Sequence, residues 1–117
     1  VYYVYPLVLD RKKIKVDRKI IVKALEAEGV QGLASSYQNL HLLPMFQKKI
    51  CYGKKSFPWS LNKNKNIIYK KGTCPVAERL QTKEFLSIAI CNYDLDKNDA
   101  LNIVKCFKKV WQNLHKL

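Results

Sequence analysis

The apolar run FLSIAI, residues 85–90, is the stretch that decides the fold of this chain. It is compact and almost wholly hydrophobic, with the usual length of a buried strand, and it is too short for a buried helix. We therefore expect residues 85–90 to form the central strand of a small sheet, with the other elements arranged around it.

The segment after this strand has the pattern of a long amphipathic helix. Asp96 is a good N-cap residue, and Asp99 three positions later makes a near capping box. The apolar residues that follow are spaced four, three, four and three apart, with two more beside them: Ile103, Phe107, Val110, Leu114 and Leu117, flanked by Val104 and Trp111. This broad apolar face predicts a terminal helix packed across the sheet.

A shorter helix is predicted just before the central strand, in KGTCPVAERL, residues 71–80. Thr73 is the expected N-cap, Pro75 is tolerated in a first turn, and Glu78 lies near the positive end of the helix dipole. Cys74 could be a thiol activated by the helix start or a packing residue. We favour the packing residue, because neither a resolving cysteine nor a base stands nearby in the sequence.

The N-terminal third supplies two further strands. Residues 1–10, VYYVYPLVLD, are rich in aromatic and β-branched side chains, and Pro6 predicts that this strand lies at an edge or bulges. Residues 32–37, GLASSY, are expected to form a short second strand.

Between these strands, residues 16–30, VDRKIIVKALEAEGV, have the pattern of a helix. Asp17 is the expected N-cap, and Gly29 is placed to close the helix in a left-handed conformation. The apolar stripe expected to face the core comprises Ile20, Ile21, Ala24, Leu25 and Ala27.

The connection from Leu42 to Gly72 is long for a compact domain. Residues 47–66 are basic, polar and turn-rich, and NIIYKK, residues 66–71, carries a weak strand signal. Segments of this length are usually functional or mobile.

Together these elements predict an α+β fold with a small, mostly antiparallel sheet of three to four strands. Helices pack on one face, and a long helix ends the chain. The 117 residues predict a single domain, residues 1–117. The chain opens on Val1-Tyr2-Tyr3, already strand-like, so we expect residue 1 to be a cut point inside a longer protein.

The net charge is +13, from 22 basic and nine acidic residues. Nineteen of the basic residues are Lys and three are Arg. Nucleic-acid sites depend on Arg for bidentate contacts, so a lysine-dominated excess points to them only weakly and favours a solvated basic surface. An acidic partner domain would also leave this chain basic.

Four cysteines stand at positions 51, 74, 91 and 106 without a C-x-x-C pair, so a structural zinc site is not expected. No apolar run is long enough to span a bilayer, and the first residues lack the features of a signal peptide. A reducing, cytoplasmic location is therefore the expectation.

Few residues are candidates for chemistry. His41 is the stronger of the two histidines, because it lies in a loop with Tyr37 and Asn39, whereas His115 near a helix C-terminus is explained by the helix dipole. The chain has no glycine-rich phosphate loop, serine-nucleophile elbow or H-E-x-x-H motif. By itself it does not contain a complete active site.

The order of these segments resembles a known family. R-x-x-x-x-x-x-L-x-x-x-G-[IV] from Arg18, Y-x-x-L-H-x-x-P from Tyr37 and C-P-V-A-E-R-L from Cys74 occur in sequence, between YPLVLD and a final LSIAI strand and DLDKNDALNIVKCFKKVW helix. Over nearly its whole length the chain resembles the C-terminal small domain of the DegT/DnrJ/StrS family, the sugar-nucleotide aminotransferases of the aspartate-aminotransferase type.

The resemblance implies pyridoxal phosphate chemistry in a homodimer, with an amino group passing from glutamate or glutamine to a keto sugar, typically nucleotide-linked. Such enzymes contribute to the biosynthesis of cell-surface polysaccharides. In the family, a lysine of a large domain forms the Schiff base and an aspartate there pairs with the pyridinium nitrogen. That large domain is not in this sequence, so the chain alone is expected to hold no cofactor and to be inactive.

The resemblance also assigns site residues. Tyr37 and His41 match the Y-x-x-L-H segment, and with Asn39 they are expected to bind the sugar or its phosphates at a domain interface. Arg18 and Glu78 match family positions as helix-end and interface residues, or as direct substrate contacts.

Two other functions compete with this one. The first is a basic nucleic-acid-binding module that stacks bases on Tyr52 and Trp59. The second is a free-standing interaction domain that pairs with a separate large-domain protein. Against the first stand the few arginines and the absence of any recognisable nucleic-acid fold signature in the sequence.

Overall fold

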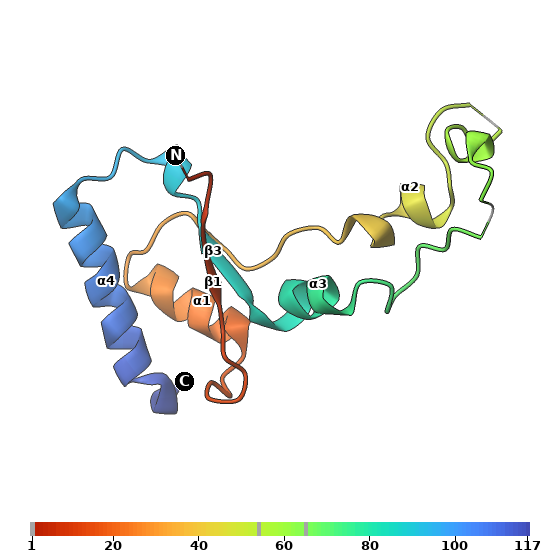
Figure 1. The fold of residues 1–117 in the computed structure, drawn as a ribbon. Helices are drawn as coiled ribbons and strands as arrows, with labels where there is room; N and C mark the ends of the chain where they lie inside the picture. The colour runs from red at the N-terminus through yellow and green to blue at the C-terminus, as the bar shows by residue number, and fades with distance from the viewer. Residues whose placement is uncertain (1, 54, 65) are drawn as a thin grey trace. The chain divides into compact units, whose positions relative to one another are not determined.

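The structure is a computed structural model that describes residues 2–53, 55–64 and 66–117 (Figure 1). The chain divides into two compact units: Val1–Tyr37 with Leu80–Leu117, and Gln38–Arg79. The sequence predicted a single domain, residues 1–117.

A three-stranded antiparallel sheet forms the base of the first unit. Its strands β1 (Tyr5–Val8), β2 (Leu33–Ala34) and β3 (Phe85–Ile88) lie in the order β1-β3-β2. The central position of β3 confirms the prediction from FLSIAI, although the strand stops at Ile88 and a 3₁₀ turn, η4 (Ile90–Asn92), follows. β3 is the most buried strand because it has a neighbour on both edges and a helix over one face.

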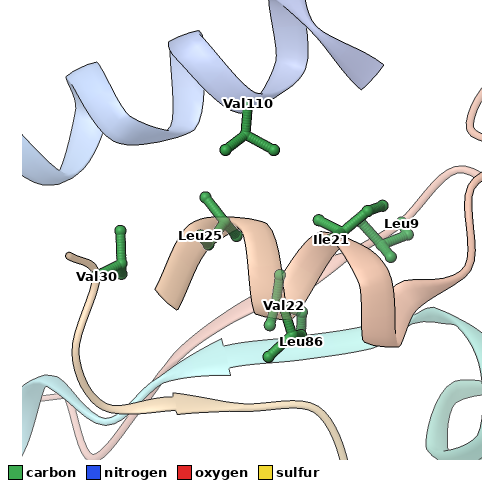
Figure 2. Close-up of a cluster of buried hydrophobic side chains, with 7 residues drawn as sticks. All are labelled: Leu9, Ile21, Val22, Leu25, Val30, Leu86 and Val110. Atoms are coloured by element: carbon green, nitrogen blue, oxygen red, sulfur yellow. The ribbon is translucent and has the colours of Figure 1, made fainter. Parts of the chain in front are cut away.

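Helix α1 (Arg18–Ala27) covers this sheet, and its ends follow local rules. The Asp17 carboxylate accepts a hydrogen bond from the Lys19 N–H at 2.7 Å, and Gly29 follows the helix with a left-handed φ of 97°. The predicted apolar stripe is partly wrong. Ile21, Val22 and Leu25 are buried, whereas Ile20 is 42% exposed. Val22, which was not part of the predicted stripe, faces the sheet and is buried in place of Ile20 (Figure 2).

The C-terminal helix α4 (Lys97–Gln112) lies on the far side of α1 from the sheet (Figure 2). Asp96 and Asp99 form the predicted capping box, with N···O distances of 2.8 and 3.1 Å. Side chains from β3, α1 and α4, and from the segments that follow β1 and α1, meet in one core: Leu9, Ile21, Val22, Leu25, Val30, Leu86 and Val110. The α+β fold with helices on one face of an antiparallel sheet is therefore confirmed.

The second unit consists of short elements: η1 (Leu40–Leu42), α2 (Pro44–Gln47), η2 (Trp59–Leu61) and α3 (Pro75–Arg79). The strand predicted at 66–71 is wrong, because residues 67–70 have no regular secondary structure. Their backbone pairs with no strand. Instead, the Tyr69 ring packs on Phe46 with ring centroids 5.3 Å apart.

Burial in the second unit is unusual. Among its described residues, Glu78 is the only buried one, and every buried hydrophobic side chain of the described chain lies in the first unit. A carboxylate thus takes the interior place that an apolar side chain usually holds.

Candidate functional site

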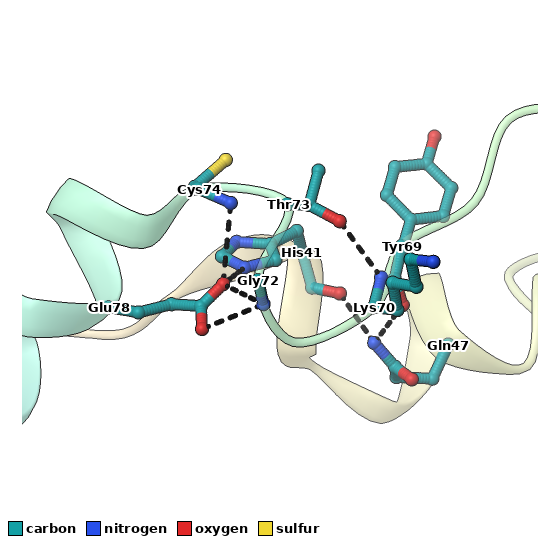
Figure 3. Close-up of polar contacts among 8 residues, drawn as sticks. All are labelled: His41, Gln47, Tyr69, Lys70, Gly72, Thr73, Cys74 and Glu78. Atoms are coloured by element: carbon teal, nitrogen blue, oxygen red, sulfur yellow. Dashed lines mark hydrogen bonds and ion pairs between the residues drawn. The ribbon is translucent and has the colours of Figure 1, made fainter.

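The strongest candidate site in the structure is a hydrogen-bonded pair of side chains, His41 and Glu78, in the second unit (Figure 3). The Nε2 atom of His41 lies 2.9 Å from Oε1 of Glu78, and the two side chains are 12% and 11% exposed. His41 comes from η1 and Glu78 from α3, so the pair joins two of the sequence motifs singled out above.

The backbone of the KGTC turn wraps around the Glu78 carboxylate. The Gly72 N–H lies 2.8 and 2.9 Å from its two oxygens, and the Cys74 N–H lies 3.3 Å from Oε1. Gly72 has a φ of 90°, a left-handed conformation that favours glycine and lets the turn close on the carboxylate. Glu78 therefore holds this turn together as well as binding the histidine.

Thr73 is not the N-cap of α3, contrary to the sequence prediction. Its hydroxyl accepts a hydrogen bond from the Lys70 N–H at 3.3 Å, and the helix begins at Pro75 after Cys74, whose carbonyl accepts from the Glu78 N–H. The Glu78 side chain reaches back to the N–H groups of Gly72 and Cys74 before the helix, much as the acidic residue of a capping box accepts from the N-cap N–H.

The surroundings of Glu78 favour its charged form. The hydrogen bond with His41 does most to hold the pKa of the Glu78 carboxyl below its usual value; burial opposes this, and the Gly72 and Cys74 N–H groups add to it. An ionised carboxylate only accepts hydrogen bonds, so Nε2 of His41 must carry the donated hydrogen.

This pairing sets what His41 can do. No other described residue bonds its second ring nitrogen, Nδ1. With Nε2–H directed at Glu78, Nδ1 of the neutral ring can accept a hydrogen bond from a ligand hydroxyl.

Gln47 supports the same site, and the sequence reasoning missed it. Its side-chain amide donates to the His41 carbonyl at 2.8 Å and also to the Tyr69 carbonyl. It stands six residues after His41 at the end of α2. The short separation between Gln47 and His41 was the only sequence feature that could have suggested this contact, because Gln47 belongs to no recognised motif.

Tyr37 and Asn39 are placed differently from His41. Tyr37 belongs to the first unit, where its ring is 67% exposed and its N–H donates to Oε1 of Gln81 at 2.6 Å. Asn39 is half-buried in the second unit and precedes η1, where its carbonyl accepts from the Leu42 N–H. The part of Tyr37 and Asn39 in a substrate site stays a prediction.

Arg18 lies inside the first unit, 7% exposed. Its Nη1 atom donates to the carbonyls of Leu80, Gln81 and Phe85 at 3.3, 2.9 and 3.0 Å, which closes the π-helical turn η3 (Leu80–Glu84) that leads into β3. Burial lowers the pKa of Arg18 from its usual value, and the nearby Asp17 opposes that change. These contacts give Arg18 a structural role, and substrate contact by it stays a prediction.

Among the described residues, no lysine lies in surroundings typical of a Schiff-base lysine for pyridoxal phosphate. Every described lysine is exposed except Lys49, which is half-buried, and the cavity that Lys49 lines contains no carboxylate to pair with a pyridinium nitrogen. Across residues 2–53, 55–64 and 66–117, no group of three or more His, Cys, Asp or Glu side chains could hold a metal ion. Nor does any described helix combine the length and apolar character needed to cross a bilayer.

No family model matches this chain, and neither the curated proteins nor the solved structures compared with it include a match.

Proposed function

We propose that this chain is the C-terminal small domain of a pyridoxal-phosphate-dependent aminotransferase acting on a nucleotide-linked keto sugar, and that His41 binds the substrate. The observation that carries the proposal is the His41–Glu78 pair. The Y-x-x-L-H and C-P-V-A-E-R-L segments carried the family resemblance separately, and their ionisable residues lie 2.9 Å apart.

The pair suits substrate binding better than it suits packing alone. A buried carboxylate must be matched by hydrogen bonds, and Glu78 has them from His41 and from two backbone N–H groups. Glu78 fixes the histidine tautomer, while Nδ1 is left to accept a hydrogen bond from a sugar hydroxyl. A positioned imidazole of this kind binds and orients a polar ligand without the need for a nucleophile beside it.

In this proposal, the cofactor chemistry belongs to a large domain of the same protein. The cofactor supplies the electron sink for moving an amino group from glutamate or glutamine to the keto carbon. His41, with Tyr37 and Asn39, would bind the sugar nucleotide at the interface between the small and large domains. The intact enzyme would be a homodimer. The four cysteines are all free, which suits a cytoplasmic enzyme.

We expect His41→Ala in the full-length enzyme to raise the KM for the sugar nucleotide by about 3- to 10-fold, because one hydrogen bond between the imidazole and a sugar hydroxyl is lost. The kcat should change much less, since the residue is assigned to binding. His115→Ala removes the other histidine, exposed at the end of the chain, and should leave KM unchanged.

Two results would contradict the proposal. One is a KM that His41→Ala does not alter. The other is a coding sequence upstream of residue 1 that is open and in frame but encodes no large domain with a Schiff-base lysine. The second result would favour the free-standing interaction domain.

One observation favours nucleic-acid binding as a second candidate. Residues 38–79 contain nine basic residues and one acid, and the Tyr52 ring is 70% exposed. Trp59 is less suited to stacking, because its indole N–H is bonded to the Tyr69 hydroxyl at 3.1 Å and its ring packs edge-on against Phe46. Titration with an oligonucleotide at two salt concentrations tests this candidate, since phosphate-driven binding weakens steeply with salt.

A further inference from the structure

The first unit contains an open, mainly apolar groove of about 500 Å³. It lies between β1, with the turn that follows it, and the C-terminal end of the chain, which comprises α4 and the 3₁₀ turn η5 (Leu114–Lys116). Apolar side chains line it from both sides: Val8, Leu9, Ile14, Phe107, Trp111 and Leu114. The volume is within the range of about 300–1,000 Å³ typical of ligand sites, so the groove can take several apolar side chains of a partner.

Apolar surface also continues outside this groove along α4. Val104, Phe107 and Trp111 follow the helical spacing i, i+3, i+7, so they share one side of the helix. The rings of Phe107 and Trp111 have their centroids 5.7 Å apart, and Val104 and Trp111 are exposed. On the opposite side of the groove, Val8 is 63% exposed. A continuous apolar surface of this kind is typical of a site where another molecule binds.

The net positive charge of the first unit is concentrated in the two segments that form the groove. Residues 7–15 and 104–117 contain eight basic residues and one acid. The rest of the first unit contains five basic and seven acidic residues. Apolar surface and positive charge therefore occur together in these segments, whereas the remainder of the unit is slightly acidic.

Most of these basic side chains have no carboxylate partner within the chain. Lys109 is the one base of the two segments that is paired with a carboxylate among the described residues. The Asp10 carboxylate, their one acid, accepts from the backbone N–H of Lys12 at 2.9 Å. The ammonium groups of Lys12, of Lys13, which lines the groove, and of exposed Lys108 are thus available to carboxylates of a partner.

This combination suits a protein helix better than it suits a nucleic acid or a membrane. A groove with an apolar lining and basic edges is complementary to an amphipathic helix whose polar face is acidic. The apolar side chains in the lining offer nucleotide bases neither hydrogen-bond donors nor acceptors. A lipid surface accepts apolar side chains that protrude from a protein, whereas these line a hollow.

We propose that this groove binds a protein partner through an amphipathic helix whose polar face is acidic. Apolar side chains of that helix pack on Val8, Phe107 and Trp111, and its carboxylates pair with Lys13 and Lys108. The proposal does not rest on the aminotransferase assignment, because the groove belongs to the first unit and the histidine–glutamate pair belongs to the second, so either can fail alone.

The test uses the full chain and a fluorescein-labelled peptide of about 18 residues, since shorter isolated helices are marginal in water. Leucines at i, i+3, i+4 and i+7 form its apolar face, and glutamates are placed on the opposite face. Fluorescence anisotropy follows binding at constant ionic strength. We expect saturable binding, and binding weaker by about tenfold or more for a peptide of the same composition in scrambled order, which has the same charge but no apolar face.

Val8→Asp should weaken peptide binding by about tenfold or more, because it removes an apolar contact and places a carboxylate beside those of the peptide. Val76→Asp is the matched control: this valine is 55% exposed and belongs to the second unit, so the Kd should change by less than about twofold.

Charge is tested separately. Lys13→Glu should weaken binding by about fivefold or more, because Lys13 lines the groove. Lys23→Glu makes the same change at an exposed position of α1 outside the groove and should alter the Kd by less than about twofold. The circular dichroism spectrum of each variant establishes that it is folded.

Equal weakening by Lys13→Glu and Lys23→Glu would overturn the proposal, because it would show general attraction of acidic peptides to a basic protein. Binding of the scrambled peptide as tight as that of the amphipathic one would overturn it too, as would the absence of binding.

Other occupants are tested with the same variants. A dimer of the chain in sedimentation experiments that Val8→Asp abolishes would assign the groove to a second copy. Binding of phosphatidylglycerol vesicles that Val8→Asp abolishes and Val76→Asp does not would assign it to a lipid surface. Either result would overturn the proposal.

Discussion

Glu78 shows how a single residue can organise a unit that lacks a hydrophobic interior. Its two carboxylate oxygens accept from one imidazole and from the N–H groups of Gly72 and Cys74, so one side chain holds η1, the KGTC turn and α3 together. The sequence pattern explained Glu78 as a complement to the helix dipole. The structure adds that its charge is buried and that three donors are aimed at it.

The lowered pKa of Glu78 predicts a pH dependence. Because the folded-state pKa lies below the ordinary value of 4.5, the carboxylate stabilises the second unit above that pH, and this stabilisation is lost as the pH falls through the folded pKa. We expect the Gly72 and Cys74 amides to exchange hydrogen progressively faster, relative to their intrinsic rates, from about pH 5 downward.

Glu78→Gln tests the cause of that dependence. In this variant, the amide hydrogens of Gly72 and Cys74 should exchange faster at neutral pH. Their protection should no longer fall as the pH is lowered, because residue 78 has no carboxylate to protonate. Glu26→Gln, at an exposed position on α1, is the control and should behave like the unmodified chain. An unaltered pH profile in Glu78→Gln would assign the effect to another group.

At the scale of elements, the first unit is built by successive layers. β3 receives a strand on each edge, α1 covers one face, and α4 covers α1 (Figure 2). Helix α1 is therefore covered on two sides, which explains why Val22 joins Ile21 and Leu25 in the core. The sequence predicted an apolar stripe along a single face of α1. Such a stripe is typical of a helix that packs against only one neighbouring element.

Two substitutions on α1 test which of its apolar side chains lie in the core. Leu25 is fully buried, so Leu25→Ala should lower the free energy of unfolding by about 2–5 kcal/mol through lost burial and a cavity. Ile20→Ala removes a side chain that is 42% exposed and should cost less than about 1 kcal/mol. Urea denaturation of both variants measures the difference, and equal losses would mean that Ile20 packs in the core after all.

At the scale of the whole molecule, the distribution of apolar burial is uneven. All eight buried hydrophobic side chains of the described residues belong to the first unit, whereas the second unit depends on aromatic contacts and on the hydrogen bonds of Glu78. Polar contacts at a partly exposed site stabilise a structure less than apolar burial does.

This difference predicts two levels of stability within one chain. Amides of β3 should exchange only on global unfolding, and those between residues 38 and 79 should exchange about a hundredfold faster or more, through local opening. Hydrogen exchange read by mass spectrometry measures both. Equal protection in the two units would show that they unfold as one cooperative body.

The sequence predicted correctly those features that depend on interactions between residues close together in the chain. Asp17 and Asp96 cap their helices as predicted, because a cap needs only a short polar side chain and the N–H groups two or three residues later. FLSIAI predicted the central strand, since its length and composition require burial. The α+β class followed from the order of these elements.

Tertiary structure decided the rest, because the groups involved are far apart in the chain. His41 and Glu78 were singled out separately, but they are 37 positions apart in the sequence and only the folded second unit pairs them. Arg18 looked like a helix-end residue, and its guanidinium proves to be held by carbonyls more than 60 positions away. The strand signal at 66–71 failed because a strand needs a partner edge, and here the Tyr69 ring packs on Phe46 instead. The sequence by itself thus determined the helix ends, the central strand and the fold class, which depend on neighbouring residues. Only the tertiary structure decided that the Glu78 carboxylate is buried and paired with His41. The free energy of burying a carboxylate depends on the hydrogen-bond donors around it, and some of these come from distant parts of the chain.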